Sequence, residues 1–423
     1  MRGAPRREPA AAKRKLPGVA GRPVPGIAEE AVVKLSCLKS NLMEGLNVVG
    51  RVVPSKSTLP VLGNVLLATD RGQLKLAATN LDMAISYWVG AHVDEDGAVT
   101  LPARLLADFV SSLPDDRIDM ALTTRGYTMH LTCGRFSANI KGIDAEDFPR
   151  IPGVADAVPY ALPAAILREC IQSVVFAAAP DDSRPVLSGV LFTLKDGQLT
   201  LAAADGFRLA VRSAELTDTP VEGGQPSVPL QMIVPAKALT EVARVLTDGD
   251  AQVEIAATPN KNQVLFRLAT AETKAEIVSR LIEGQFPDYH KILPKQYSTR
   301  AVVNTSEFLR ATRAASVFAR DNSMIVKLDV TPGPEELVPG RLNVTANSAE
   351  VGDNAGEVDA SVDGGEAQIA FNGRYLRDAL EALGTAQAAL EVTGPSSPGV
   401  IKPVGEQNGY LHVIMPMQVS GGR

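Results

Sequence analysis

Hydrophobic and polar positions follow the same order at three places along the chain. Residues 199–211 (LTLAAADGFRLAV) alternate as a strand, an Asp-Gly turn and a second strand. The pattern recurs at 74–85 and, more faintly, at 342–351. A spacing of about 125 to 140 residues is the size of a small domain, so the repeat predicts three copies of one folded unit.

Each copy is predicted to contain two helices among several antiparallel strands. The first helix is expected at 37–53, at 163–178 and after a cap at Thr305 or Ser306, and the second at 103–113, 238–246 and 375–383. Two helices cover only one face of such a sheet, so three linked units can place all their helices on a common side. We predict an α+β fold with domains at 33–155, 156–296 and 297–419, a disordered basic Pro/Ala-rich extension at 1–32 and a tail at 420–423.

Composition narrows the class of protein. The chain has 423 residues, is 45% hydrophobic and carries a formal net charge of −6. An acidic protein binds nucleic acid only if its basic residues gather on one face. No apolar run approaches the roughly 18 residues of a membrane span, and the N-terminal segment has no apolar h-region, so we expect neither a transmembrane helix nor a secretory signal. Cys37, Cys133 and Cys170 are scattered, which fits a reducing, cytoplasmic environment.

The predicted second helices share a charge pattern. Each has a cation at its start and an acid four residues later: Arg104 and Asp108, Lys237 and Glu241, Arg374 and Asp378. A cation at a helix N-terminus opposes the macrodipole, and cation-before-acid is the weaker orientation for a helical pair. Two interpretations stay open: solvated side chains with a weak pair, inherited by all three copies, or a ring of cations facing a polyanion. The latter would include cations of the first-helix segments: Arg51, Lys56, Arg168, Arg310, Arg313 and Arg320.

Enzyme motifs are missing from the sequence. There is no phosphate-binding loop, no dinucleotide fingerprint and no nucleophile elbow. The histidines His92, His130, His290 and His412 form no metal-binding pattern. We therefore expect no catalytic residues, no metal and no cofactor, and an enzyme on a repeated α+β scaffold has no residues to support it.

Four motifs in order resemble one known family. The segments TLPVLGN (58–64), ADGFRLA (204–210), FPDY (286–289) and MPM (415–417) are similar to those of the bacterial DNA sliding clamp, the DNA polymerase III beta subunit. The resemblance covers residues 33–419. It implies a head-to-tail homodimer whose helices line a central hole and whose sheets form the outer wall. Such a ring encircles duplex DNA without reading its sequence and tethers the replicative polymerase for processivity, with no catalysis of its own.

The resemblance also implies partners and sites. The implied partners are duplex DNA, the polymerase catalytic subunit, an ATP-driven clamp loader and other proteins with a clamp-binding motif, with no membrane. The partner-peptide pocket maps to Leu187, Ala204, Gly206, Phe207, Arg208, Leu209, Pro287, Lys291, Ile292, Asn372, Tyr375, Pro398, Val413, Met415, Pro416 and Met417. DNA-facing positions are Lys56, Arg104 and Lys237, to which the internal repeat adds Arg374. At the dimer interface, Arg135, Phe136 and Ala138 of one chain are expected to meet Val317 and Phe318 of another.

Alternatives remain at individual residues and for the protein as a whole. Leu209, Ile292 and Val413 also suit plain core, and Phe136 and Phe318 also suit the core of their own domains. Ala204 stands where the family often has Thr, and Phe207 where it often has His or Tyr. These departures raise the alternative of a clamp paralogue that replaces the main clamp, for example an inhibitor-resistant one. Val33-Lys34 matches the family's usual Met-Lys start, so we also hypothesise that translation begins at Val33.

Overall fold

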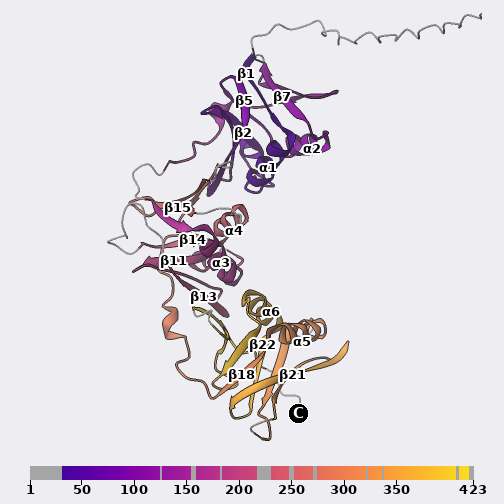
Figure 1. Cartoon of the computed structure of the whole chain (residues 1–423), viewed down its shortest axis with the longest axis vertical. Helices are drawn as coiled ribbons and strands as arrows, with labels where there is room; N and C mark the ends of the chain where they lie inside the picture. Colours follow the sequence, from indigo (N-terminus) through magenta and orange to yellow (C-terminus); the bar gives the residue numbers. More distant parts are fainter. Residues whose placement is uncertain are drawn as a thin grey trace, which may run out of the picture.

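The computed structural model describes residues 31–123, 126–153, 159–181, 183–216, 230–246, 252–269, 274–320, 323–335, 338–405 and 409–418. The predicted extension at 1–32, apart from its last two residues, and the predicted tail at 420–423 lie outside these ranges. The described chain follows an arc of three units, and the helices α1 to α6 lie on its concave side (Figure 1).

Unit 1 runs from the first strand to β9. Its elements are β1 (Ala31–Leu38), α1 (Lys39–Val49), β2 (Asn64–Asp70), β3 (Gln73–Thr79), β4 (Met83–Val89), β5 (Ala91–Glu95), β6 (Ala98–Pro102), α2 (Ala103–Ser112), β7 (Arg117–Thr123), β8 (Thr128–Cys133) and β9 (Phe136–Lys141). The first helix begins at Lys39 rather than at Cys37, because Cys37 still pairs with Ala91 and Ile118 within the sheet.

Unit 2 repeats this order. Its elements are β10 (Tyr160–Pro163), α3 (Ala164–Val174), β11 (Gly189–Lys195), β12 (Gln198–Ala204), β13 (Arg208–Glu215), β14 (Leu230–Pro235), α4 (Ala236–Val245), β15 (Gln252–Ala257), β16 (Gln263–Ala269) and β17 (Lys274–Arg280). The predicted strand–turn–strand at 199–211 is confirmed as β12 and β13. The linker to unit 3 contains the short helix η5 (Tyr289–Lys291).

Unit 3 repeats it again. Its elements are β18 (Thr299–Asn304), α5 (Thr305–Phe318), β19 (Ile325–Thr331), β20 (Gly340–Ser348), β21 (Gly352–Gly364), β22 (Ala367–Asn372), α6 (Gly373–Ala382), β23 (Gln387–Val392), β24 (Gly399–Pro403) and β25 (Tyr410–Ile414). The predicted cap at Thr305 or Ser306 is wrong: the cap is Asn304, whose side chain accepts the N–H groups of Ser306 and Glu307. The long strand β21 was not predicted, because its first half is largely exposed and lacks a buried alternation.

The sheets run from one unit into the next. In the described part of the chain, the strand orders are β5-β1-β7-β8-β9, β10-β15-β16-β17-β4-β3-β2-β6 and β14-β11-β12-β13-β25-β24-β23-β18-β21-β20-β19-β22. β4 of unit 1 pairs with β17, the last strand of unit 2, and β13 of unit 2 pairs with β25, the last strand of unit 3. Backbone hydrogen bonds therefore join consecutive units edge to edge.

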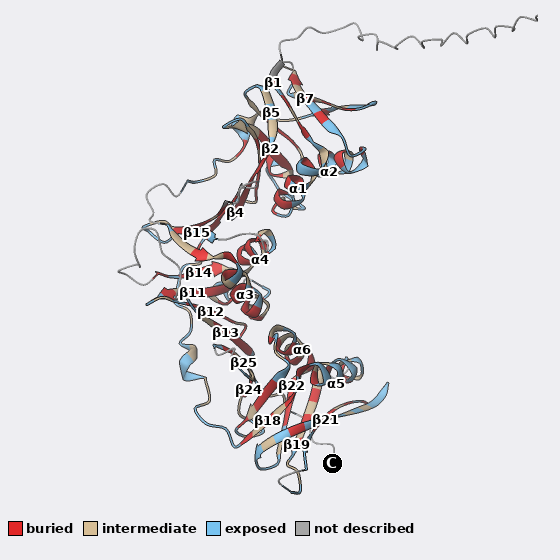
Figure 2. Cartoon of the chain, viewed as in Figure 1, coloured by how far each residue is buried: buried red, intermediate tan, exposed pale blue. Residues whose placement is uncertain are grey.

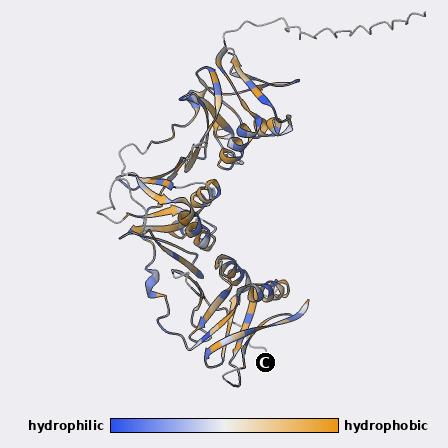
Figure 3. Cartoon of the chain, in the orientation of Figure 1, coloured by the Kyte–Doolittle hydropathy of each residue, from blue (hydrophilic) through white to orange (hydrophobic). Residues whose placement is uncertain are grey.

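Alternation along the strands positions the core and the outer surface. Leu199, Leu201 and Ala203 of β12 are fully buried in the main core, to which the helices also contribute. Thr200 and Ala202 point to the opposite face, away from the helices. Buried residues and hydrophobic stretches follow the strands of each unit (Figures 2 and 3). Each second helix buries residues three or four apart, as α6 does with Leu376, Ala379 and Leu380, and leaves its other side exposed. The predicted α+β class with three tandem copies is confirmed.

Candidate functional site

The junction between units 2 and 3 gathers residues that are far apart in sequence. Leu209 of β13 lies opposite Val413 of β25, and Arg208 lies opposite Ile414. The backbone N–H of Met415 then donates to the carbonyl oxygen of Phe207 at 2.8 Å. The end of the chain is thereby held beside the Asp205-Gly206 turn.

That turn is fixed by its own residues. Asp205 Oδ1 accepts the backbone N–H groups of Phe207 at 2.8 Å and Arg208 at 3.0 Å. Gly206 has φ +93°, and a Cβ there would come within 2.6 Å of Arg184 Nη1. Glycine therefore suits this position sterically as well as conformationally. Phe207 is left 59% exposed beside Met415, which is 43% exposed.

Arg208 is a structural residue at this junction. Its Nε donates to Asp205 Oδ2 at 3.1 Å, its Nη1 to Asp378 Oδ2 at 2.8 Å and its Nη2 to the Phe176 carbonyl oxygen at 2.5 Å. The guanidinium carbon also lies 4.4 Å from the centre of the Tyr375 ring. The residue is buried, so its charge holds unit 2 to α6 of unit 3 instead of facing solvent.

An apolar cluster covers the outer face of the same sheet. Leu209 and Val413 are almost fully buried in it, together with Leu191, Val211 and Val400. The linker residues Phe286, Tyr289 and Leu293 pack against this cluster. The alternative interpretation as core therefore holds for Leu209 and Val413. It does not hold for Ile292, which is 50% exposed.

The remaining predicted pocket residues come from the elements around this junction. Ala204 ends β12, Leu187 lies on η4 (Pro185–Ser188), Pro287 precedes η5, and Lys291 at its end pairs with Asp288 at 3.2 Å. Asn372 caps α6, Tyr375 lies in its first turn, and Pro398 immediately precedes β24. Pro416 follows β25, and the Met417 N–H donates to the Ala370 carbonyl oxygen at 2.8 Å.

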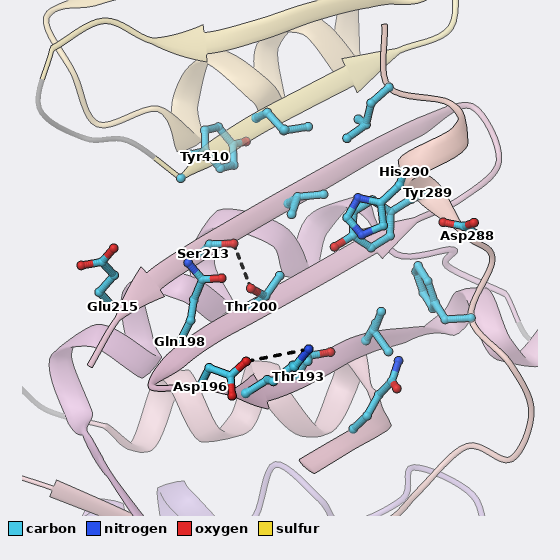
Figure 4. Close-up of a pocket in the computed structure, with 18 of the residues that line it drawn as sticks. Thr193, Asp196, Gln198, Thr200, Ser213, Glu215, Asp288, Tyr289, His290 and Tyr410 are labelled. Carbon is cyan, nitrogen blue, oxygen red and sulfur yellow. Dashed lines mark hydrogen bonds and ion pairs between the residues drawn. The ribbon is translucent and has the colours of Figure 1, made fainter. Parts of the chain in front are cut away.

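A cavity of about 1220 Å³ lies next to this cluster and was missed from the sequence (Figure 4). Its floor includes Thr200 and Ser213, whose hydroxyls are 2.9 Å apart, and Tyr289 and Tyr410 also line it. Pro287 is the one predicted pocket residue in its lining. Strand alternation would have placed Thr200 and Ser213 on one face. The linker that walls the cavity carries no periodic pattern, so only the folded chain reveals the cavity.

The predicted DNA-facing cations lie on the helix side of the molecule. The second residue is Arg104 in α2, Lys237 in α4 and Arg374 in α6. All three are exposed, as is Lys56 in the loop after α1, and none forms an ion pair with a described residue. The cations are therefore solvated, as the first interpretation also held, but the pair that it expected within each helix is not formed. Glu241 pairs with Arg51 and Arg244, and Asp378 pairs with Arg208 and Arg377.

The predicted interface residues lie at opposite ends of the arc. Arg135 occupies the turn before β9, and Phe136 and Ala138 are on β9 itself. Val317 and Phe318 end α5. Phe136 and Val317 are each 54% exposed, so Phe136 is not core of its own domain, whereas Phe318 packs partly against the core. One chain does not bring the two sets together.

The described residues were also searched for a metal site, a reactive cysteine and a membrane-spanning helix. No group of His, Cys, Asp and Glu side chains in the described ranges is placed to hold a metal ion. Burial raises the pKa of the Cys37 and Cys170 thiols to about 12, so neither is a ready nucleophile. Among the helices that the structure describes, none has the length and apolar character needed to cross a bilayer.

His412 gives the junction a predicted pH dependence. It is fully buried on β25, it stacks on Phe176 at 5.7 Å, and its ring nitrogens have no hydrogen-bond partner among the described residues. Burial, with a smaller contribution from the Arg208 charge, lowers the pKa of His412 from 6.5 to about 3. Between about pH 6.5 and pH 3 the unfolded chain binds this proton and the folded chain does not, so the free energy of unfolding should fall as pH drops, by up to about 1.4 kcal/mol per pH unit.

Urea unfolding of the wild type and of His412→Phe at pH 7 and pH 5 checks this expectation. Between pH 7 and pH 5 the free energy of unfolding of the wild type should fall by about 2 kcal/mol more than that of the variant. The same substitution at the exposed His92 controls for the loss of a histidine. An equal loss in wild type and His412→Phe would show that His412 does not carry the effect.

Comparisons with known proteins match nearly all of the described chain. Family models described as the N-terminal, central and C-terminal domains of the DNA polymerase III beta subunit match residues 33–152, 161–288 and 290–418. The chain is 33% identical to a protein of Synechocystis named "Beta sliding clamp", over 92% of this chain and 100% of that one. A protein of the same name from Bacillus subtilis is 27% identical over 91% of this chain and 100% of its own length.

Solved structures agree with these relatives. The DNA polymerase sliding clamp of Bacillus subtilis superposes with a TM-score of 0.82 at 27% identity, covering 92% of this chain and 100% of that one. The DNA polymerase III subunit beta of Pseudomonas aeruginosa gives 0.80 at 29% identity, covering 91% and 100%. Nothing in these similarities favours a paralogue with a separate role.

Proposed function

The chain belongs to the DNA polymerase III beta subunit family, the bacterial sliding clamps, and from this we propose that two copies close head to tail into a ring around duplex DNA. It is a DNA sliding clamp, an accessory subunit that gives a DNA polymerase processivity and does not itself catalyse a reaction. DNA and the polymerase are its partners.

The observation that supports the proposed ring is that both internal junctions use the same strand pairing. β4 and β13 are the second strands of equivalent hairpins, and each pairs with the last strand of the next unit. The equivalent strand in unit 3 is β21, and the last strand of unit 1 is β9.

Both of these strands offer a free edge in the described structure. β21 pairs with β18 only through Ala360–Gly364, so 352–359 have a partner on one side alone, and β9 ends its sheet. Pairing β21 of one chain with β9 of another repeats the internal junction. A heterologous contact that repeats in this way forms a closed ring when the rotation permits.

The concave side is the proposed DNA surface. The exposed cations Lys56, Arg104, Lys237 and Arg374 have no competing ion pair with described residues, so they are available to phosphates. Contacts to phosphates fix position without reading sequence, as a sliding ring requires.

The junction of units 2 and 3 is the proposed docking site for partner peptides. Phe207, Ile292 and Met415 present exposed apolar side chains beside the buried cluster around Leu209 and Val413. Met and aromatic side chains adapt to short linear motifs from several partners. We propose that the polymerase catalytic subunit, an ATP-driven clamp loader and other motif-bearing proteins bind here, in the cytoplasm.

Retention on DNA of defined topology tests encirclement. The chain is loaded onto nicked circular DNA by a clamp loader from the same source, and half of each sample is then linearised. A ring should stay on circles and be lost from the ends of linear DNA. Equal retention on the two forms would reject the proposal.

Charge reversal tests the concave surface. A Lys237→Glu, Arg374→Glu variant should bind DNA more weakly at low salt. The slope of its log affinity against log salt concentration should be smaller in magnitude by roughly 1 to 2, because about one unit of slope is lost with each phosphate contact. The matched control is Lys195→Glu, an exposed cation on a strand of unit 2. A variant that matches the control would remove these two residues from the DNA surface.

A further inference from the structure

The second helix of every unit carries an acid at one position. α2, α4 and α6 each have ten residues, and the sixth is Asp108, Glu241 or Asp378. The environments of these three carboxylates differ, although their places in the repeat are the same. The difference follows from which unit precedes each one.

Glu241 pairs with the preceding unit. Its Oε2 lies 3.7 Å from Nη1 of Arg51, and its side chain is 10% exposed. Arg51 is the second residue after α1 ends at Val49. A cation at the end of the first helix of unit 1 thus meets the acid of unit 2.

Asp378 contacts the same corner of the unit before it. It accepts from Arg208 Nη1 at 2.8 Å, and Arg208 Nη2 donates to the carbonyl oxygen of Phe176. Phe176 is the second residue after α3 ends at Val174, the position that Arg51 has in unit 1. At this junction the cation comes from β13, and the residue at the helix end is a phenylalanine.

Asp108 is the member of the set that lacks such a contact. It is exposed, it forms no ion pair with a described residue, and unit 1 is the first unit that the structure describes. At the other end, Arg320 is the second residue after α5 ends at Phe318, and it too is exposed without an ion pair to a described residue. Each is half of a contact that the internal junctions complete.

We propose that Asp108 of one chain pairs with Arg320 of the partner subunit when the ring closes, an inference that rests on the proposed head-to-tail dimer. The partner is a second copy of this chain, and the contact repeats the Arg51–Glu241 pair at each closing junction. It also selects the head-to-tail orientation, because α2 of one chain faces the end of α5 of the other only in that arrangement.

Apolar residues beside both groups support the pairing. Leu105, one turn before Asp108, is 54% exposed, and Val317, three residues before Arg320, is also 54% exposed. The residue of α6 equivalent to Leu105 is Tyr375, which covers the Arg208 guanidinium. Leu105 and Val317 would shield the new pair from water in the same way, which strengthens it relative to an exposed pair.

Charge reversals measured by sedimentation test the pairing. Asp108→Arg and Arg320→Asp should each raise the dimer dissociation constant roughly tenfold or more, because every ring contains the junction twice and like charges then meet. The double variant Asp108→Arg, Arg320→Asp restores opposite charges and should return to within about threefold of the wild type. Asp196→Arg and Lys195→Asp, an exposed pair on unit 2, are the matched controls.

The outcomes separate this inference from the proposed function. A wild-type chain that stays monomeric would overturn the ring itself. A dimeric wild type with single reversals no weaker than the controls would leave the ring and overturn the pairing. A double variant as weak as the single ones would also overturn it. Thermal unfolding of each variant checks that the monomer fold is retained, as expected for two exposed residues.

Discussion

Phe136→Asp should leave each chain folded and prevent two chains from closing into a ring. Phe136 begins β9 and is 54% exposed in the single chain, so folding of unit 1 does not depend on burying it. In the proposed ring the position becomes buried between β9 and the end of α5. An unpaired carboxylate there costs several kcal/mol at each of the two junctions. We expect the dimer dissociation constant to rise at least 100-fold and retention on circular DNA to be lost.

Leu59→Asp is the matched control for this variant. Leu59 is another exposed apolar residue of unit 1, 47% exposed in the loop before β2. It should leave the dimer intact. Sedimentation velocity over a dilution series measures the dimer dissociation constant of the two variants. A Phe136→Asp chain that dimerises as the control does would place the interface elsewhere.

Arg208→Met should destabilise the junction of units 2 and 3 by about 3 to 5 kcal/mol, because it removes one partner of a buried ion-pair network. The Asp205 and Asp378 side chains are 8% and 15% exposed, so both carboxylates would remain largely desolvated without their cation. The turn that presents Phe207 also depends on Arg208, so peptide binding should weaken as well.

A surface arginine supplies the comparison for Arg208. Arg341 pairs with Glu357 at 3.1 Å with side chains 61% and 50% exposed, so Arg341→Met should cost less than about 1 kcal/mol. Urea unfolding followed by intrinsic fluorescence and far-UV circular dichroism measures both variants. Equal losses would mean that the Arg208 network contributes no more than a surface pair.

The internal junctions are the reason for proposing a ring. A hairpin strand pairs with the last strand of the next unit, and helix ends meet second helices, at both internal junctions. Because the units always join in the same direction, β9 of unit 1 and β21 of unit 3 keep an unpaired edge in the described chain. In the proposed ring, a second copy would pair with both edges.

The sequence by itself determined the repeated unit, the helices and most strands, because strand alternation and helical spacing are local properties. It also placed the cations of α2, α4 and α6 at equivalent positions. It did not determine that Arg208 is buried between Asp205 and Asp378, because Asp378 is 170 residues away in the chain. The sequence also could not reveal β21, because pairing with β20 makes it a strand and its hydrophobic pattern does not. Nor could it reveal the cavity beneath the linker. Only the tertiary structure decided which cations are paired within the chain and which, such as Arg104 and Arg320, have no ion pair with a described residue, because charge partners are chosen by proximity in space.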